Sequence, residues 1–435
     1  MVKSLDAAKA AGEQQKIQQE LAQIFTPGVP IANPELFSGR QDLLDTLGRE
    51  LLVTGRNFVL YGERGVGKTS FYNVLLNGLA VERHNCSKQD DFVTIFLNIL
   101  SKRGEQFTAA DQESLAKMGY KIGDKLPIAV EGSVEAKAKE IPVAQRRLDL
   151  NFVLNKLRRL ERKVQVIVLD EFHNIESDDV QTGIIEVVKG LSDEKISIKL
   201  VLVGIAESDT DLLTSPEYPQ YKGRHFVATR IPRMNREELA DIIYKRERLF
   251  HIKFAKQDVS ELSRIAAGYP QFAHDLALSA CMAWLVANFA AVFAHWVDKF
   301  PLLGLVARPF LRSVTVESIE WDITARDLNQ AVTRLAKQFE TNEPAMSRRL
   351  KDSMAGNDPP GIRAALGLLA TTEADDVGID EIRAGAHLSA EQVRRLFRDD
   401  LDTVVENRDG RYRLRIPTFR AYILSCEYLS AKAAG

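Results

Sequence analysis

Short apolar runs alternate with helical patterns through the first half of the chain. The runs "NFVLY" (57–61), "VQVIVLD" (164–170) and "IKLVLVGI" (198–205) are almost continuously apolar, as are strands buried on both faces of a parallel sheet. The stretch "DVQTGIIEVVKGLSD" (179–193), between the last two runs, repeats its apolar residues with a helical period. This alternation predicts an α/β fold built on a doubly wound parallel sheet.

From residue 236 to residue 280 the apolar positions follow a helical period, which predicts a helical region. One face of its first helix is marked by Leu239, Ile242, Ile243 and Leu249. The segment 292–321 is unusually apolar and holds two of the three tryptophans. It is either a core helix with a turn at Pro301 or a surface on which a partner protein docks.

One apolar stretch, 276–294, is near the length that crosses a bilayer, about 20 residues. Asn288 interrupts it, and His274, Asp275 and His295 bracket it closely. We expect a buried helix here and no membrane, with membrane contact as the alternative.

The C-terminal segment has a pattern of its own after the linker "NDPPG". Three helical stretches, 361–372, 379–386 and 389–401, precede "TVVENRDGRYRLRI" (403–416), which alternates around Asp409-Gly410 as a hairpin does. Three helices followed by a hairpin are similar to a winged helix. The expected domains are an N-terminal helical arm (1–33), an α/β domain (34–234), a helical domain (235–358) and a winged-helix domain (359–435).

Composition narrows the class of protein further. With 58 basic and 60 acidic residues the net charge is −2, so any nucleic-acid site must be local. The cysteines Cys86, Cys281 and Cys426 lie far apart without metal-type spacing. This suits a cytoplasmic protein and argues against a disulfide scaffold or a zinc site.

The segment "GERGVGKT" (62–69) fits the pattern G-x-x-x-x-G-K-[ST] without a mismatch. Its glycines let successive backbone N–H groups turn toward one anion, at the start of a helix whose dipole favours negative charge. We expect Lys68 to reach the terminal phosphates of ATP and Thr69 to bind Mg²⁺. The residues expected to contact the nucleotide here are Gly62, Glu63, Arg64, Gly65, Val66, Gly67, Lys68, Thr69 and Ser70.

A second acidic motif ends the buried strand "VQVIVLD". Asp170 lies where a carboxylate holds Mg²⁺, and Glu171 follows where a base orients the attacking water. Both motifs fall at carboxyl ends of strands, where ligands of such sheets bind.

These residues resemble the AAA+/STAND group of P-loop ATPases, above all origin-recognition ATPases and related bacterial ATP-binding proteins. The resemblance covers about residues 34–290 and a piece at the C-terminus. It implies an α-helical lid over 235–358, one helix of which begins at a GxP motif containing Pro270. It also implies an adenine contact near "PELFSGRQDLLDTL" (34–47), where Phe37 and Arg40 match, and an arginine finger at Arg224.

The sequence departs from this family pattern in several places. The sensor residue that ends the fourth strand has only Ser208 as a candidate, and the sensor-2 arginine falls at Gln271. Arg230 and Arg233 are alternatives to Arg224 as the finger. His173 and Asn174 either sense the γ-phosphate or satisfy a strand end. Residues near 102–145 form an inserted loop or hairpin.

The winged helix offers DNA contacts, because arginine binds phosphates and guanine edges. The candidates are Arg394, Arg395 and Arg398 in the third helix and Arg408, Arg411, Arg413 and Arg415 in the hairpin. Asp399, Asp400 and Asp402 lie beside them, so protein contact remains the alternative.

The sequence thus predicts an ATPase that acts as a molecular switch, with ATP and Mg²⁺ as cofactors. Its nucleotide state would control engagement of DNA or protein through the winged helix, in a homo-oligomer or with a partner protein. The alternative is a low-turnover, ATP-dependent recruitment protein, such as a DNA-mobility helper or a component of phage defence.

Overall fold

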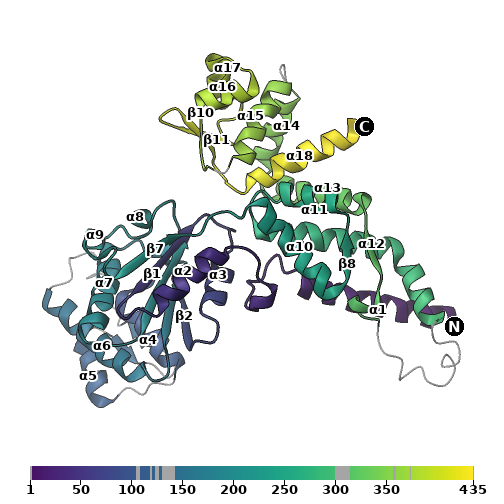
Figure 1. Ribbon diagram of the computed structural model, residues 1–435. Coiled ribbons are helices and arrows are strands. Elements are labelled where there is room, and N and C mark those ends of the chain that lie inside the picture. Colours follow the sequence, from purple (N-terminus) through teal and green to yellow (C-terminus); the bar gives the residue numbers. More distant parts are fainter. Residues whose placement is uncertain are drawn as a thin grey trace. The chain divides into compact units, whose positions relative to one another are not determined.

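The computed structural model describes residues 2–103, 108–117, 120–122, 127–129, 143–298, 314–355, 359–372 and 374–434 (Figure 1). The chain forms two compact units. The sheet unit contains Gln41–Arg64 and Lys68–Pro232, and the helical unit contains Met1–Arg40, Gly65–Gly67 and Arg233–Gly435. The predicted division into four domains stays a prediction.

Among the described residues, five parallel strands form the main sheet in the order β2-β5-β6-β1-β7. Their bounds are β1 (Asn57–Gly62), β2 (Val81–Asn85), β5 (Val166–Asp170), β6 (Lys199–Ile205) and β7 (Phe226–Arg230). β5 is buried along its whole length and β6 along all but its ends, as their apolar sequences predict. The predicted α/β fold is therefore confirmed.

Helices pack around this sheet. α4 (Phe92–Lys102), α6 (Val143–Leu160) and α7 (Asp178–Asp193) pack against one another and share a hydrophobic core with β5 and β6. α2 (Gln41–Leu51) packs against α3 (Lys68–Leu75), the helix that follows β1. The short elements are α5 (Ala109–Lys117), α8 (Asp209–Leu212), α9 (Tyr218–Tyr221) and the antiparallel pair β3 (Tyr120–Ile122) and β4 (Pro127–Ala129). The sequence predicts an inserted loop or hairpin near residues 102–145, and the pair of β3 and β4 corresponds to the hairpin. Residues 123–126 and 130–142 of this insertion lie outside the described part.

β2 is an edge strand that the hydrophobic pattern does not reveal, since only His84 within it is buried. Its outward carbonyls are nevertheless satisfied. Lys102 Nζ donates to Arg83 O at 2.8 Å, and Arg103 Nη2 donates to Val81 O at 2.7 Å. These bonds cover an edge that would otherwise be open to strand pairing.

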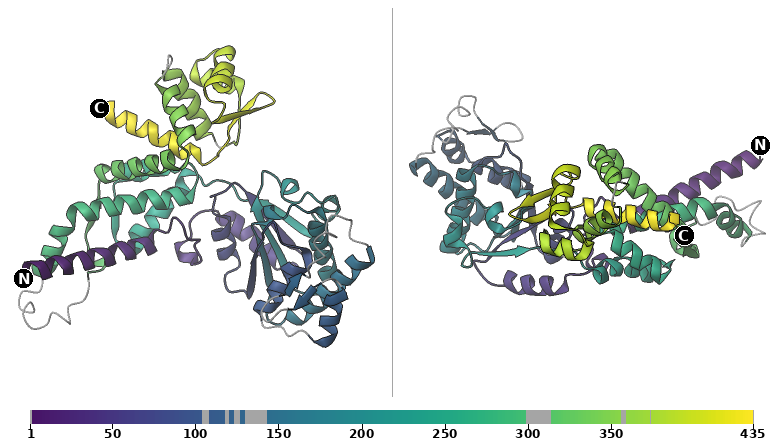
Figure 2. Two further views of the ribbon diagram at one scale, coloured as in Figure 1. Left: turned by 180° about the vertical axis from the view of Figure 1, so that it is seen from behind. Right: turned by 90° about the horizontal axis from the view of Figure 1, so that it is seen from above.

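The helical unit is built around α12 (Pro270–Asp298), which packs against α1 (Val2–Ile24), α10 (Arg236–Phe250), α11 (Lys256–Ile265) and α13 (Ala325–Asn342). α1 runs alongside α12 in every view (Figures 1 and 2). α14 (Pro344–Met354) follows α13, and β8 (Ile252–Phe254) pairs in parallel with β9 (Trp321–Ile323). Trp321 is buried against Trp284 of α12, with ring centroids 4.9 Å apart.

Within the described residues, Pro270–His295 is long and apolar enough to cross a membrane, with a mean hydropathy of 2.0. A buried core helix of a soluble protein passes the same test, and 44% of this window is buried. Of the apolar segment 292–321, residues 299–313 lie outside the described part. Whether it is core or docking surface therefore stays a prediction.

The C-terminal elements follow the predicted order. α15 (Pro359–Thr371), α16 (Ile379–Ala386) and α17 (Ala390–Arg395) precede the hairpin of β11 (Val405–Arg408) and β12 (Arg411–Leu414). Asp409 and Gly410 both have positive φ, 54° and 84°, as the tightest hairpin turns require. β10 (Val377–Gly378) joins the hairpin, and α18 (Phe419–Ala434) returns to pack against α13 and α15.

Candidate nucleotide-binding site

The loop between β1 and α3 has a backbone that only glycine adopts without strain. Gly62, Gly65 and Gly67 have φ values of 150°, 83° and 89°. A Cβ on Gly62 would lie 2.5 Å from Ile231 O, so no other residue fits there. Lys68 begins α3, and its ammonium donates to Gly62 O at 3.0 Å and to Glu63 O at 2.8 Å. This geometry fits a phosphate cradle, in which the lysine lies against the loop it serves.

Asp170 at the end of β5 accepts hydrogen bonds from hydroxyl groups of α3. Tyr72 Oη donates to Asp170 Oδ2 at 2.7 Å, and Thr69 Oγ1 donates to the same oxygen at 3.4 Å. Burial raises the pKa of Tyr72 well above its usual range, and the charge of Asp170 adds to this. The adjacent hydroxyl and carboxylate oxygens of Thr69 and Asp170 fit Mg²⁺, which prefers oxygen ligands. The sequence did not single out Tyr72, although its position one turn after Thr69 places it on the same helix face.

Glu171 follows Asp170 in a left-handed conformation, with φ 55° and ψ 34°. A non-glycine residue in this region is uncommon and often marks a functional position. Its N–H donates to Asp170 Oδ1 at 2.8 Å, and its side chain is 54% exposed. The chain turn therefore directs the Glu171 side chain outward, beside the buried carboxylate of Asp170.

His173 lies between Glu171 and the end of β6. Its Nδ1 accepts a hydrogen bond from Ile205 N at 3.3 Å, and its Nε2 is 3.4 Å from Glu171 Oε2. Burial lowers the pKa of His173, although the charge of Glu171 opposes this. Because Nδ1 accepts the Ile205 N–H, the neutral ring carries its proton on Nε2, facing Glu171.

Asn174 connects two strand ends. Its Nδ2 donates to Cys86 O at 3.0 Å, and Cys86 N donates to Asp170 O at 2.8 Å. These bonds continue the pairing of β2 with β5. Asn174 therefore satisfies a strand end, which is one of the two roles that the sequence analysis considers for it.

A cavity of about 920 Å³ opens beside these side chains. Its lining includes Thr69, Asp170 and Glu171 together with Arg83, Asn85 and Lys102 from the neighbouring β2 and α4. The predicted catalytic and Mg²⁺-binding carboxylates therefore face a space large enough for a ligand.

In the helical unit, Arg40 lies against the loop residues Gly65–Gly67. Its Nη2 donates to Val66 O at 2.6 Å, and its N–H donates to Glu238 Oε1 at 2.6 Å. Burial lowers the pKa of Arg40 to about 10, partly offset by Glu238. Pro270, the first residue of α12, also borders the loop, since its Cγ lies 3.3 Å from an ideal Cβ on Gly67.

The other family-derived positions are more scattered. Phe37 is buried, and its carbonyl accepts a hydrogen bond from Lys245. Gln271 Oε1 lies 3.8 Å from an ideal Cβ on Gly65, so it faces the loop where the family pattern has an arginine. Ser208 caps α8 in a capping box with Asp211, a structural use of its hydroxyl.

The three arginines considered as fingers occupy different places. Arg224 is exposed just before β7, beside the amino end of β1, because Asn57 N donates to His225 O at 2.8 Å. Arg230 ends β7 in register with Tyr61, at the edge that carries the phosphate loop. Arg233 belongs to the helical unit, where its guanidinium donates to Ala374 O at 3.1 Å and lies 3.5 Å from Asp375.

Several of the C-terminal arginines form ion pairs with aspartate or glutamate side chains. Arg398 pairs with Asp399 at 2.8 Å, and Arg411 pairs with Asp376 at 2.6 Å. Glu406 of β11 pairs with Arg408 of the same strand, with Arg413 of β12 opposite, and with Arg415 just after β12. Arg394 and Arg395 are exposed on α17.

A glycine-rich loop between β1 and α3, with Asp170 at the end of β5 in the same parallel sheet, defines the fold of the P-loop nucleoside triphosphatases. Residues 51–210 match the sequence model of the AAA domain family, which covers β1, β2, β5 and β6. Residues 51–210 are thus similar to the AAA domain family over the strands that carry the phosphate loop and Asp170.

Several solved structures are similar to the chain at low identity. A Walker-type ATPase of Pyrococcus abyssi is 14% identical over 92% of this chain and 99% of its own, with a TM-score of 0.46. The ORC2 protein of Aeropyrum pernix, in ADPNP–ADP complexes, is 14% identical over 95% and 98%, also with a TM-score of 0.46. A STAND protein of Pyrococcus horikoshii with a tetratricopeptide repeat sensor is 12% identical over 89% of this chain and 42% of its own, with a TM-score of 0.37.

Proposed function

We propose that the protein binds Mg-ATP at the phosphate loop and hydrolyses it, and that it acts as a nucleotide-dependent switch. The observation that carries this proposal is the convergence of Thr69 and Asp170, 3.4 Å apart, beside the glycine loop, with Glu171 next in the chain. The oxygens of Thr69 and Asp170 would hold Mg²⁺, which would supply positive charge against the phosphates.

The residues divide the work in this proposal. Backbone N–H groups of the loop and Lys68 bind the phosphates, and the oxygens of Thr69 and Asp170 hold the metal. Glu171 accepts a proton from the attacking water, since its exposed carboxylate lies at the cavity. Tyr72 fixes the rotamer of Asp170 through its 2.7 Å hydrogen bond.

The output of the switch is assigned to the C-terminal part, which we propose to be a winged helix that engages DNA or a partner protein. Arg40, Pro270 and Gln271 support a coupling between nucleotide and helical unit, because all three border Gly65–Gly67. A ligand shifts a conformational equilibrium only through contacts that differ between the two states. Groups that border the loop and belong to the helical unit are suitable for such contacts.

The experiment that tests this proposal is steady-state ATP hydrolysis by the full chain, with and without duplex DNA, over a range of protein concentrations. A rate that rises with DNA and more than linearly with protein supports an assembling, DNA-dependent ATPase. Absence of both nucleotide binding and hydrolysis contradicts the proposal.

A second candidate is a recruitment protein that turns ATP over slowly. Gln271, in place of the arginine of the family pattern, favours it, because an amide does not supply the positive charge that stabilises a transferring phosphoryl group. Tight ATP binding with slow hydrolysis that neither DNA nor protein concentration changes is its expected signature.

A further inference from the structure

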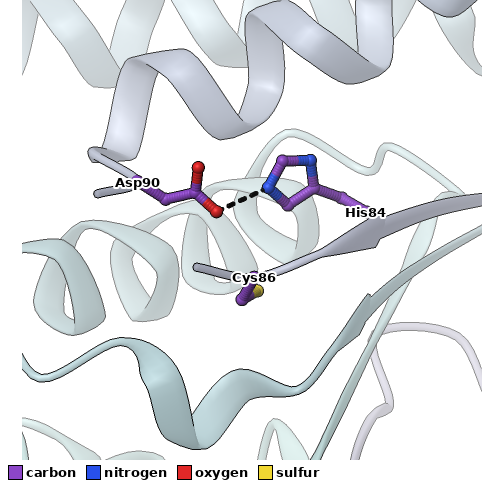
Figure 3. A group of neighbouring side chains, drawn as sticks. All are labelled: His84, Cys86 and Asp90. Carbon is purple, nitrogen blue, oxygen red and sulfur yellow. Dashed lines mark hydrogen bonds and ion pairs between the residues drawn. The ribbon is translucent and has the colours of Figure 1, made fainter. Parts of the chain in front are cut away.

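Three side chains of different chemistry meet at the end of β2, outside the nucleotide site (Figure 3). They are His84, Cys86 and Asp90. The imidazole nitrogen, the thiol sulfur and a carboxylate oxygen all lie within 4.8 Å of one another. His84 and Cys86 are buried, and the side chain of Asp90 is only 12% exposed.

Local geometry explains this meeting. His84 and Cys86 are two residues apart in extended chain, so their side chains point to the same side. The chain then turns through Ser87–Asp90, where Asp90 N donates to Ser87 O at 3.1 Å. Ser87 N donates back to Asp90 Oδ2 at 2.8 Å, and the same oxygen lies 2.8 Å from His84 Nε2. The turn thus returns a carboxylate to the strand it has just left.

We propose that His84 Nε2, Cys86 Sγ and Asp90 Oδ2 bind a divalent transition metal of the zinc class, with water as the fourth ligand. Nitrogen, sulfur and oxygen are the donors that Zn²⁺ takes in tetrahedral sites, whereas Mg²⁺ prefers oxygen alone. Two donors on one Zn²⁺ lie roughly 3.3–3.8 Å apart, given bonds of about 2.0–2.3 Å. Donors already within 4.8 Å therefore reach a common ion through side-chain movements of about an ångström.

Binding exchanges protons for metal bonds. The thiol of Cys86 loses its proton to solvent as the sulfur–metal bond forms, and the imidazole binds in its neutral form. The hydrogen bond between His84 and Asp90 is replaced by one bond from each residue to the metal. Asp90 keeps its bond from Ser87 N, which orients the carboxylate from outside, as second-shell donors do.

The site is connected to the nucleotide site through the backbone. Cys86 N donates to Asp170 O at 2.8 Å, and Cys86 O accepts from Asn174 Nδ2 at 3.0 Å. His84 also lines the 920 Å³ cavity that Asp170 and Glu171 face, which gives an ion a route to the site. The metal fixes the turn after β2 against the strand end that carries Asp170.

The test is titration of the full chain, after removal of metal by chelator, with Co²⁺ followed by Zn²⁺. We expect one equivalent of Co²⁺ to produce a sulfur-to-cobalt charge-transfer band and tetrahedral visible bands, both abolished when Zn²⁺ is added. Co²⁺ bound by Thr69 and Asp170 gives no sulfur band, so this result is independent of the ATPase proposal.

Variants locate the ligands. Cys86→Ser should remove the band. His84→Ala should weaken Co²⁺ binding by more than about tenfold, because loss of a second-shell partner alone already lowers metal affinity by about that factor. Cys426→Ser, at a thiol far along the chain, is the matched control and should keep the band. No sulfur band in the wild-type protein overturns the proposal without any variant, and a band that persists in Cys86→Ser overturns the assignment of the ligands.

Discussion

His173 joins the end of β6 to the carboxylate of Glu171. Its Nδ1 accepts the N–H of Ile205 at 3.3 Å, and its Nε2 lies 3.4 Å from Glu171 Oε2. β6 lies between β5 and β1, so this imidazole couples the centre of the sheet to the residue proposed to activate water. It is a positioning residue in the proposed reaction.

Two substitutions separate the two contacts of His173, the hydrogen bond from Ile205 N and the approach to Glu171. His173→Gln can place an amide N–H where Nε2 was, whereas His173→Asn keeps only an acceptor near Nδ1. We expect the Asn variant to lose about tenfold in kcat, because it loses the polar contact with the Glu171 carboxylate, with little change in KM for ATP. The Gln variant should retain more activity than Asn, and equal rates in both would remove the positioning role.

The positions of Arg224 and Arg230 lead to different predictions about whether an arginine finger requires a neighbouring subunit. Arg224 lies near the amino ends of the strands, so it reaches a phosphate only on a neighbouring subunit, whereas Arg230 lies near its own loop. If Arg224 is a finger, Arg224→Ala lowers turnover by about a thousandfold in the oligomer.

Mixing experiments test the finger directly. Arg224→Ala subunits keep an intact loop and Glu171, while Glu171→Gln subunits keep the finger, so the mixture should regain activity that neither variant has alone. An unchanged rate for Arg224→Ala in a confirmed oligomer rejects the finger, and Arg230→Ala is then the next variant to measure.

The exposed pair Arg394 and Arg395 should dominate any DNA binding by the C-terminal part, because Arg398, Arg411 and Arg413 are engaged with carboxylates. The double alanine variant should weaken duplex binding and lower the slope of log Kd against log salt by about two. Arg411→Ala is the control and should have a smaller effect. Fluorescence anisotropy at several salt concentrations measures both, and wild-type protein that does not bind DNA directs the role toward a protein partner.

The buried His274 should make the stability of the helical unit decrease as the pH falls. Burial lowers the pKa of His274 to about 3, with Arg246 adding to the effect, and its Nδ1 accepts the N–H of Thr26 at 3.1 Å. The folded chain therefore binds fewer protons than the unfolded chain between about pH 6.5 and pH 3. Its free energy of unfolding falls by about 1.4 kcal/mol for each pH unit of acidification within that window.

Variants isolate the contribution of this histidine from that of the carboxylates. His274→Asn keeps an acceptor for Thr26 and should flatten the pH dependence by one proton, measured by denaturant unfolding at pH 7, 6 and 5. His251→Asn, at an exposed left-handed position that Asn accepts, should leave the slope unchanged. An equal slope in His274→Asn and wild-type protein contradicts the prediction.

The sequence predicted the parts of the fold whose residues are buried on both faces or repeat with a clear period. β1, β5 and β6 are apolar runs, and the phosphate loop and the Asp409-Gly410 turn require glycine for conformational reasons. β2 was missed because an edge strand that buries only His84 has no hydrophobic pattern. The carbonyl of Arg83 in β2 accepts a hydrogen bond from Lys102 of α4, a contact that no local sequence pattern predicts.

The sequence predicted only those residues of the candidate site that lie within a contiguous motif. Lys68, Thr69, Asp170 and Glu171 belong to two contiguous motifs. Tyr72 enters the site through its hydrogen bond from α3 to Asp170, a contact between segments far apart in the sequence. The spacing of the cysteines argued against a zinc site, and the sequence did not single out the His84–Cys86–Asp90 group, because no spacing reveals the turn that brings Asp90 back to the strand.

The most direct test of the central claim is single-turnover hydrolysis of γ-labelled ATP with Mg²⁺, by wild-type protein and by Glu171→Gln. The account predicts that both bind ATP with similar affinity and that the variant is slower by about a hundredfold or more, the contribution of a general base. Glu176→Gln, an exposed glutamate paired with Lys88, should hydrolyse at the wild-type rate. Wild-type hydrolysis by Glu171→Gln, or no ATP binding by either protein, would contradict the account.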